Sequence, residues 1–119
     1  MKADIPLTYS PPVANPDIEI IKKTLPAKPG GEQECILQAD QPSPRQLVNL
    51  SKLRVLVVTA EASWHPDYDW CTVAFLRQAG VDSTLISLKE VNIRGNGHMF
   101  FLEKNSDAIA DVVRRWIEG

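Results

Sequence analysis

Residues 53–60 read Leu-Arg-Val-Leu-Val-Val-Thr-Ala, a short run that is almost uniformly apolar and rich in β-branched side chains. Such a run is typical of a parallel strand that is buried on both faces. Residues 83–88, Ser-Thr-Leu-Ile-Ser-Leu, form a second run that predicts a strand. Parallel strands need a long crossover between them, and this crossover is usually a helix. The sequence therefore predicts a strand, a helix and a second, parallel strand.

The segment between the two runs has the features of the crossover helix, from Asp67 to Ala79. Pro66 suits the first turn because its backbone angle φ is already near the helical value. Gly80 suits the end, where a residue of positive φ commonly terminates a helix. Four residues of this helix are expected to form one apolar stripe, with Arg77 and Gln78 outside it: Cys71, Phe75, Leu76 and Ala79.

A last helix is predicted to begin near Asn105 or Ser106, both of which are good N-cap residues. Its apolar residues recur at helical spacing and face a core: Ile109, Val112, Val113, Trp116 and Ile117. Two parallel strands cannot form a free-standing sheet, because both faces and both edges need cover. Residues 53–119 are therefore expected to be one end of a larger doubly wound α/β sheet.

The front of the chain has a different character, because eight of its nine prolines lie between Pro6 and Pro44. Prolines at this density prevent long regular elements. We expect residues 1–52 to be a Pro-rich irregular segment, either disordered or a long loop that packs on something outside the chain. Residues 53–119 would then be the folded α/β part.

The composition of the 119 residues is that of a soluble globular protein, with a formal net charge of −2 that favours neither nucleic acid nor a membrane surface. No apolar stretch follows the start Met1-Lys2, so we expect a cytoplasmic protein without a secretory signal. Cys35 and Cys71 are then expected to be reduced thiols. The sequon Asn49-Leu50-Ser51 is then expected to be a coincidence.

Candidate catalytic residues follow the two strands, because the carboxyl ends of parallel strands are where α/β sheets gather their functional groups. His98 comes after Gly95 and Gly97, which allow a tight turn that could bring its imidazole close to a partner. A histidine there can act as a general base and then as a general acid. Spacing alone leaves open that His98 is only a capping residue or one at the edge of the core.

A catalytic histidine needs a carboxylate that orients its ring. Glu61 is the best placed, at the tip of the first strand, and Asp67 and Asp69 are the alternatives. Asp67 could instead be an ordinary acidic residue in the first turn of a helix. A carboxylate outside these three positions also remains open.

Neighbouring residues could line a substrate pocket or simply pack: Trp64, His65 and Tyr68. A metal site is another alternative, because imidazole and carboxylate are ligands of zinc. The ligands would be His65 and His98 with Glu61 or Asp67, but no helical His-x-x-x-His or paired-cysteine spacing supports such a site. We therefore expect neither a metal nor another cofactor.

The chain resembles the C-terminal part of α/β-hydrolase-fold enzymes, and more narrowly a group of esterase-like proteins common in fungi and also found in bacteria. Residues 59–69 match the group's segment Thr-Ala/Gly-Glu-Ala-Ser-x-His-x-x-Tyr-Asp. Residues 95–99 match its segment Gly-Asn-Gly-His-Met, and residues 102–105 the Leu-Glu-Lys-Asn that follows. The front, including residues 5–13, also resembles the loop that precedes these segments.

The resemblance implies that His98 is the histidine of a Ser-His-acid triad that hydrolyses carboxylic esters. The family's Gly-x-Ser-x-Gly nucleophile segment is absent from these residues, and Ser63 stands where many relatives carry the triad acid. The expected protein is thus a C-terminal fragment, or a truncated or split form, of a serine hydrolase. It would be inactive alone and would need a nucleophile-bearing chain, or it would self-associate through a sheet edge. The alternative is a non-catalytic module that binds a hydrophobic small molecule or a protein.

Overall fold

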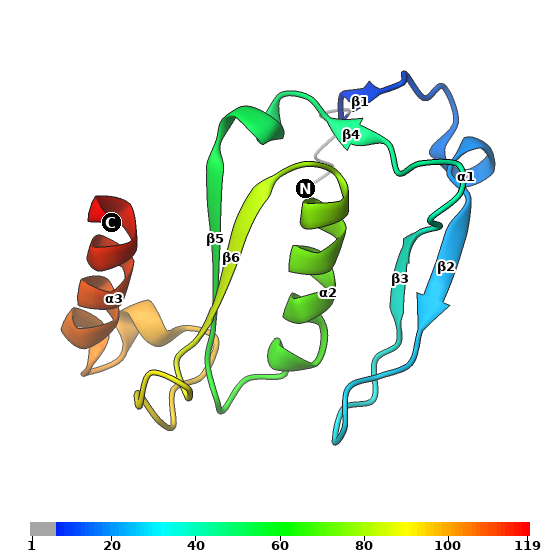
Figure 1. The fold of residues 1–119 in the computed structure, drawn as a ribbon. Helices are drawn as coiled ribbons and strands as arrows, with labels where there is room; N and C mark the ends of the chain where they lie inside the picture. Colours follow the sequence, from blue (N-terminus) through cyan, green and yellow to red (C-terminus); the bar gives the residue numbers. More distant parts are fainter. Residues whose placement is uncertain (1–6) are drawn as a thin grey trace.

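The computed structural model describes residues 7–119, and its centre is the expected strand-helix-strand unit (Figure 1). Strand β5 (Arg54–Thr59) pairs in parallel with β6 (Asp82–Ser87) along their whole length. Helix α2 (Pro66–Gln78) connects them, and Gly80, with φ of +81°, reverses the chain after it. The parallel pair and the crossover helix are thus confirmed, each boundary lying within one residue of its expected place.

Helix α3 (Ser106–Glu118) lies on the side of the sheet opposite to α2 (Figure 1). A short 3₁₀ helix, η2 (Phe100–Leu102), leads into it. Ile109 of α3 packs with Ala60 and Leu88, which directly follow β5 and β6. Placing helices on both faces of a parallel pair is the arrangement that covers its apolar side chains. That these elements belong to a hydrolase-type doubly wound sheet stays a prediction.

Residues 7–52 of the front segment contain short regular elements, none longer than four residues. The first strand, β1 (Tyr9–Ser10), pairs antiparallel with β4 (Gln46–Leu47). Between them, β2 (Lys22–Leu25) and β3 (Cys35–Gln38) form an antiparallel pair. The remaining elements are α1 (Pro16–Glu19) and the 3₁₀ helix η1 (Leu50–Lys52).

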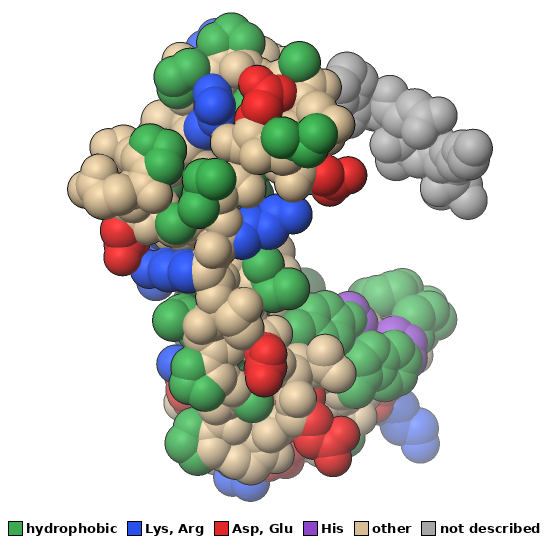
Figure 2. Space-filling view, turned by 90° about the vertical axis from the view of Figure 1, so that its right-hand side faces the viewer, with side chains coloured by type: hydrophobic (Ala, Val, Ile, Leu, Met, Phe, Trp, Pro, Cys, Tyr) green, Lys and Arg blue, Asp and Glu red, His purple; other side chains and the backbone are tan. Residues whose placement is uncertain are grey.

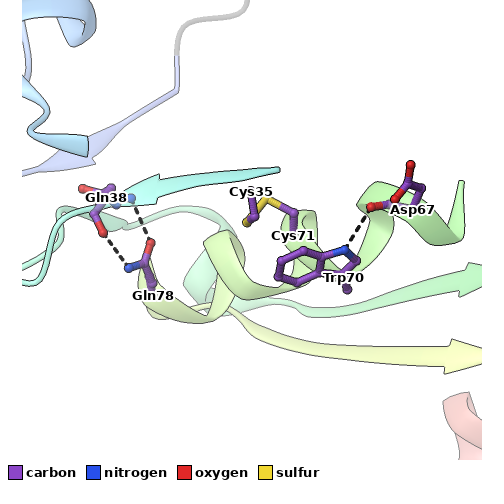
Figure 3. Close-up of a disulfide and its surroundings, with 6 residues drawn as sticks. All are labelled: Cys35, Gln38, Asp67, Trp70, Cys71 and Gln78. Carbon is purple, nitrogen blue, oxygen red and sulfur yellow. Dashed lines mark hydrogen bonds between the residues drawn. A yellow bond between two sulfur atoms is a disulfide. The ribbon is translucent and has the colours of Figure 1, made fainter. Parts of the chain in front are cut away.

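The β2–β3 pair covers the second face of α2, where the sequence had suggested an outward-facing surface (Figure 1). Cys35 of β3 and Cys71 of α2 form a disulfide, so the expectation of reduced thiols is wrong (Figure 3). The Gln78 amide donates to the Gln38 backbone oxygen and accepts from its N–H, at 2.8 and 3.1 Å. Gln78 therefore faces β3 and not solvent.

The other side of the molecule is less covered. Within residues 7–119, β5 pairs with β6 and with no other strand, and most of its side chains are only half-buried. Large apolar side chains near α3 are exposed: Phe101, Leu102 and Ile117. Among the described residues, no helix is long and apolar enough to span a bilayer.

Candidate functional site

The loops that follow β5 and β6 meet at one end of the sheet, as expected of parallel strands. The backbone N–H of Ala62, in the first loop, donates to the backbone oxygen of Asn96, in the second, at 2.8 Å. Because this bond joins the main chains of the two loops, it fixes the position of one loop relative to the other. His98 lies two residues after Asn96, which accepts the bond.

Glu61 binds the second loop through its carboxylate. The single Arg94 Nε–H is shared between the two carboxylate oxygens, at 2.9 and 3.0 Å, and Arg94 Nη2 lies 2.6 Å from one of them. The backbone N–H of Gly95, a residue with φ of +83°, donates to it at 3.1 Å. The Arg94 guanidinium holds the pKa of Glu61 below its ordinary value of 4.5. The carboxylate proposed from sequence as the triad acid is therefore engaged by the loop that carries His98.

Two further contacts hold this loop against the start of α3. The side-chain amides of Asn96 and Asn105 bond reciprocally at 2.7 and 2.8 Å, and Asn96 is only 3% exposed. The Gly97 N–H donates to Glu103 Oε1 at 2.9 Å. Asn105 stands at the N-cap position of α3, but its side chain makes no capping bond. A buried amide must be hydrogen-bonded, so this pairing determines how the loop packs.

His98 is exposed and lies against aromatic rings. Its ring centroid is 4.3 Å from that of Trp64 and 5.9 Å from that of His65. Trp64 is 61% exposed, and Figure 2 shows the two histidines next to each other among hydrophobic side chains. An imidazole in this place can be reached by a reactant from solvent and is held by ring contacts on one side. The structure thus brings together His98, His65 and Trp64 as candidate site residues.

His65 has its own polar partners. The Tyr68 hydroxyl lies 3.0 Å from His65 Nδ1, and the buried Asp69 carboxylate lies 3.4 Å from the same atom. Within residues 7–119, no carboxylate lies within hydrogen-bonding distance of the His98 ring. His65, which the sequence suggested for substrate binding, is therefore the histidine that has a nearby carboxylate.

Asp67 holds the front segment in place. Its carboxylate accepts from the backbone N–H groups of Glu32 and Gln33, at 3.0 to 3.2 Å. This contact brings the turn at Gly30 and Gly31 beside the start of α2. Asp67 therefore acts across two segments that are more than thirty residues apart in the chain.

A cavity of about 150 Å³ opens beneath the two histidines, and its lining includes Ser63. Thr59, a residue 4% exposed, also lines this cavity, and its buried hydroxyl has no hydrogen-bond partner among the described residues. A wider hollow of about 400 Å³ lies on the other side of Ser63, between Trp64 and the Lys28–Glu32 turn. The smaller cavity has room for a small acyl or alcohol group, and the wider hollow falls within the range of ordinary small-molecule pockets.

No group of three His, Cys, Asp or Glu side chains within residues 7–119 is arranged to hold a metal ion. Sequence reasoning did not identify several residues that shape the site: Thr59, Arg94, Glu103 and Asn105. The sequence offers a signal for Arg94, because this residue directly precedes Gly95 in a loop that was expected to meet the acidic loop after residue 60. The contacts of Glu103 and Asn105 depend on how the chain folds back after His98.

The chain is similar to a curated protein named "Probable secreted lipase phiG" of Fungal sp. (strain ATCC 74256), with 43% identity over 112 residues. The match includes 94% of this chain and 30% of the relative. No family model matches, and no solved structure matches. The chain is therefore homologous to less than a third of a lipase-like hydrolase.

The same comparison corrects the expected location. The relative is named a secreted protein, which contradicts the cytoplasmic location inferred from the sequence. The Cys35–Cys71 disulfide points the same way, because disulfides persist in oxidising compartments and are rare in the cytosol.

Proposed function

We propose that this chain supplies the histidine-bearing part of a secreted serine hydrolase that cleaves carboxylic esters, with the serine on a segment outside these residues. The observation that carries the proposal is the meeting of the two strand-end loops, which leaves His98 exposed at the opening of a small cavity. The similarity to a probable secreted lipase supports the same reaction class and the same location.

In this proposal His98 acts first as a base and then as an acid. Its imidazole removes the proton from the serine hydroxyl as the oxygen attacks the ester carbonyl, and it then protonates the departing alkoxide. Water repeats the sequence on the acyl-enzyme, which releases the acid and restores the serine. The general base can do nothing without the serine it activates, so the chain is expected to be inactive by itself.

Glu61 contributes in this proposal by positioning the loop that carries His98. Its carboxylate is bound to Arg94 and to the Gly95 N–H, so it acts on His98 through the loop backbone. Trp64 provides an apolar wall beside the His98 ring, where the organic part of an ester would lie. His65 lines the same cavity, and the Tyr68 hydroxyl contacts its ring at 3.0 Å from Nδ1.

The missing part is proposed to cover the open side of the molecule. The unpaired edge of β5 can accept another parallel strand, and apolar side chains near α3 offer surface to bury. The relative is more than three times as long as the matched segment, so it contains enough chain for this cover. Self-association of this chain through the same edge is the competing arrangement.

A chimera tests the function directly. This chain replaces the homologous segment of the fungal relative, and hydrolysis of p-nitrophenyl butyrate is measured with the chimera, with its His98→Ala variant and with Lys104→Ala as a matched exposed control. We expect an active chimera, a Lys104→Ala variant close to it, and a loss of about 10³-fold or more in kcat for His98→Ala.

Equal activity of the His98→Ala and parent chimeras would contradict the role of His98. A chimera that unfolds cooperatively but hydrolyses no ester would contradict the hydrolase proposal itself and would favour the non-catalytic binding module. The circular dichroism spectrum and melting curve of each variant separate loss of function from loss of fold.

A further inference from the structure

The sequon Asn49-Leu50-Ser51 lies at the end of the front segment, on the connection between β4 and β5. It was expected to be a coincidence because the protein was expected in the cytosol. The secreted relative and the disulfide remove that reason. Whether the sequon can carry a glycan therefore depends on whether Asn49 is accessible in the folded chain.

Asn49 is accessible in the folded chain. It stands in a turn directly before η1, is exposed, and makes no side-chain capping bond to that helix. Ser51 is also exposed, and its hydroxyl donates to the backbone oxygen of Val48 at 2.8 Å. An Asn-x-Ser/Thr sequon in an exposed loop with a free amide is the acceptor of N-linked glycans in secreted proteins.

Asn49 lies far enough from the candidate site that a glycan there would not block it. Asn49 precedes the first residue of β5, whereas the His98 loop follows the last residues of β5 and β6. A strand of this length separates its two ends by roughly 17–20 Å. A glycan on Asn49 would therefore extend from the end of the sheet opposite to the cavity.

We propose that Asn49 is an N-glycosylation site of this protein. The oligosaccharide is transferred from its lipid diphosphate carrier to the Asn49 side-chain amide, where a new N–C bond forms as the diphosphate leaves and the amide loses one proton. The proposal rests on the proposed secretion and is independent of the ester-hydrolysis chemistry.

The test is cell-free translation of the full chain behind a cleavable secretory leader, in the presence of microsomes. The variants are Asn49→Gln and Ser51→Ala, which destroy the sequon, and Ser51→Thr, which preserves its hydroxyl. We expect one added glycan in the parent and in Ser51→Thr, seen as slower migration that peptide N-glycosidase F removes. The enzyme converts the glycosylated asparagine to aspartate, so the mass of the peptide identifies Asn49.

A parent chain that is translocated, as shown by its protection from added protease, and that carries no glycan would overturn the proposal. So would a glycan that persists in the Asn49→Gln variant. Because the readout is migration and peptide mass, an inactive chimera in the ester assay leaves this result untouched.

Discussion

Helices α2 and α3 have the same length, thirteen residues, but very different surroundings. Helix α2 packs on β5 and β6 with one face and on β3 with the other, and a disulfide joins it to β3 (Figure 1). Helix α3 packs on the sheet end through Ile109, while Ile117 near its C-terminus is 62% exposed. The described residues therefore cover both faces of α2 but leave much of α3 exposed.

The difference indicates where the rest of the proposed enzyme belongs. The front segment lies on the face of α2 that points away from the sheet. The edge of β5 and the apolar surface near α3 have no cover within residues 7–119. The front segment also exposes apolar side chains, at Ile18, Ile21 and Ile36. An unpaired edge of the parallel sheet beside exposed apolar side chains is nevertheless what a contiguous piece of a larger sheet should show.

The largest expected effect concerns the contact between the front segment and helix α2. Replacing Cys35 and Cys71 together by serine opens a loop with a sequence separation of 36 residues, which should lower the free energy of unfolding by about 3–4 kcal/mol. Urea unfolding measures this change, and hydrogen exchange should rise in β2 and β3. The parent chain in a reducing agent is the matched control and should behave like the double variant. An unchanged urea midpoint would show that the Gln38–Gln78 and Asp67 hydrogen bonds hold the front segment without the disulfide.

A smaller effect is expected when two isoleucines of helix α3 are shortened in turn. Ile109→Val removes a methylene from a side chain that is 3% exposed, so it should cost about 0.5–1.5 kcal/mol of unfolding free energy. Ile117→Val should cost the isolated chain almost nothing, because the Ile117 side chain is exposed. In the chimera with the fungal relative, Ile117→Val should become destabilising. Equal costs of Ile117→Val in both contexts would remove the argument that this face is covered in the complete enzyme.

The smallest effect is the pH response of the Glu61 contact. Because Arg94 lowers the pKa of Glu61 in the folded chain, the contact adds stability above the ordinary pKa of 4.5 and loses it as the pH falls through the lowered value. Below that pH the amide of Gly95 should shift in NMR spectra and exchange faster. Glu61→Gln should abolish the titration of this amide. A Gly95 amide that titrates in the variant as in the parent would assign the response to another group.

The sequence allowed the central unit to be predicted because each of its signals is local. The apolar runs of β5 and β6, the proline that begins α2 and the glycine after it each act within a few residues. The meeting of the two strand-end loops followed from parallel pairing. These are the parts of the fold that agree with the sequence prediction to within one residue.

The front segment could not be predicted in the same way. Strands β2 and β3 have four residues each, and they are held by contacts with α2 that are distant in sequence. The cysteines were expected to be reduced because the protein was expected in the cytoplasm. In the site, Glu61 was placed correctly at the end of β5, but its Arg94 partner and the Asn96–Asn105 pair depend on how the last loop folds back.

Hydrogen exchange at β5 tests the central claim most directly, namely that this chain is the histidine-bearing part of a larger enzyme. In a parallel strand, alternate amides point toward opposite neighbours. The β5 amides that point away from β6 should exchange rapidly in the isolated chain. In the chimera they should become protected to the level of those bonded to β6. Equal, rapid exchange of these amides in both proteins would contradict the account.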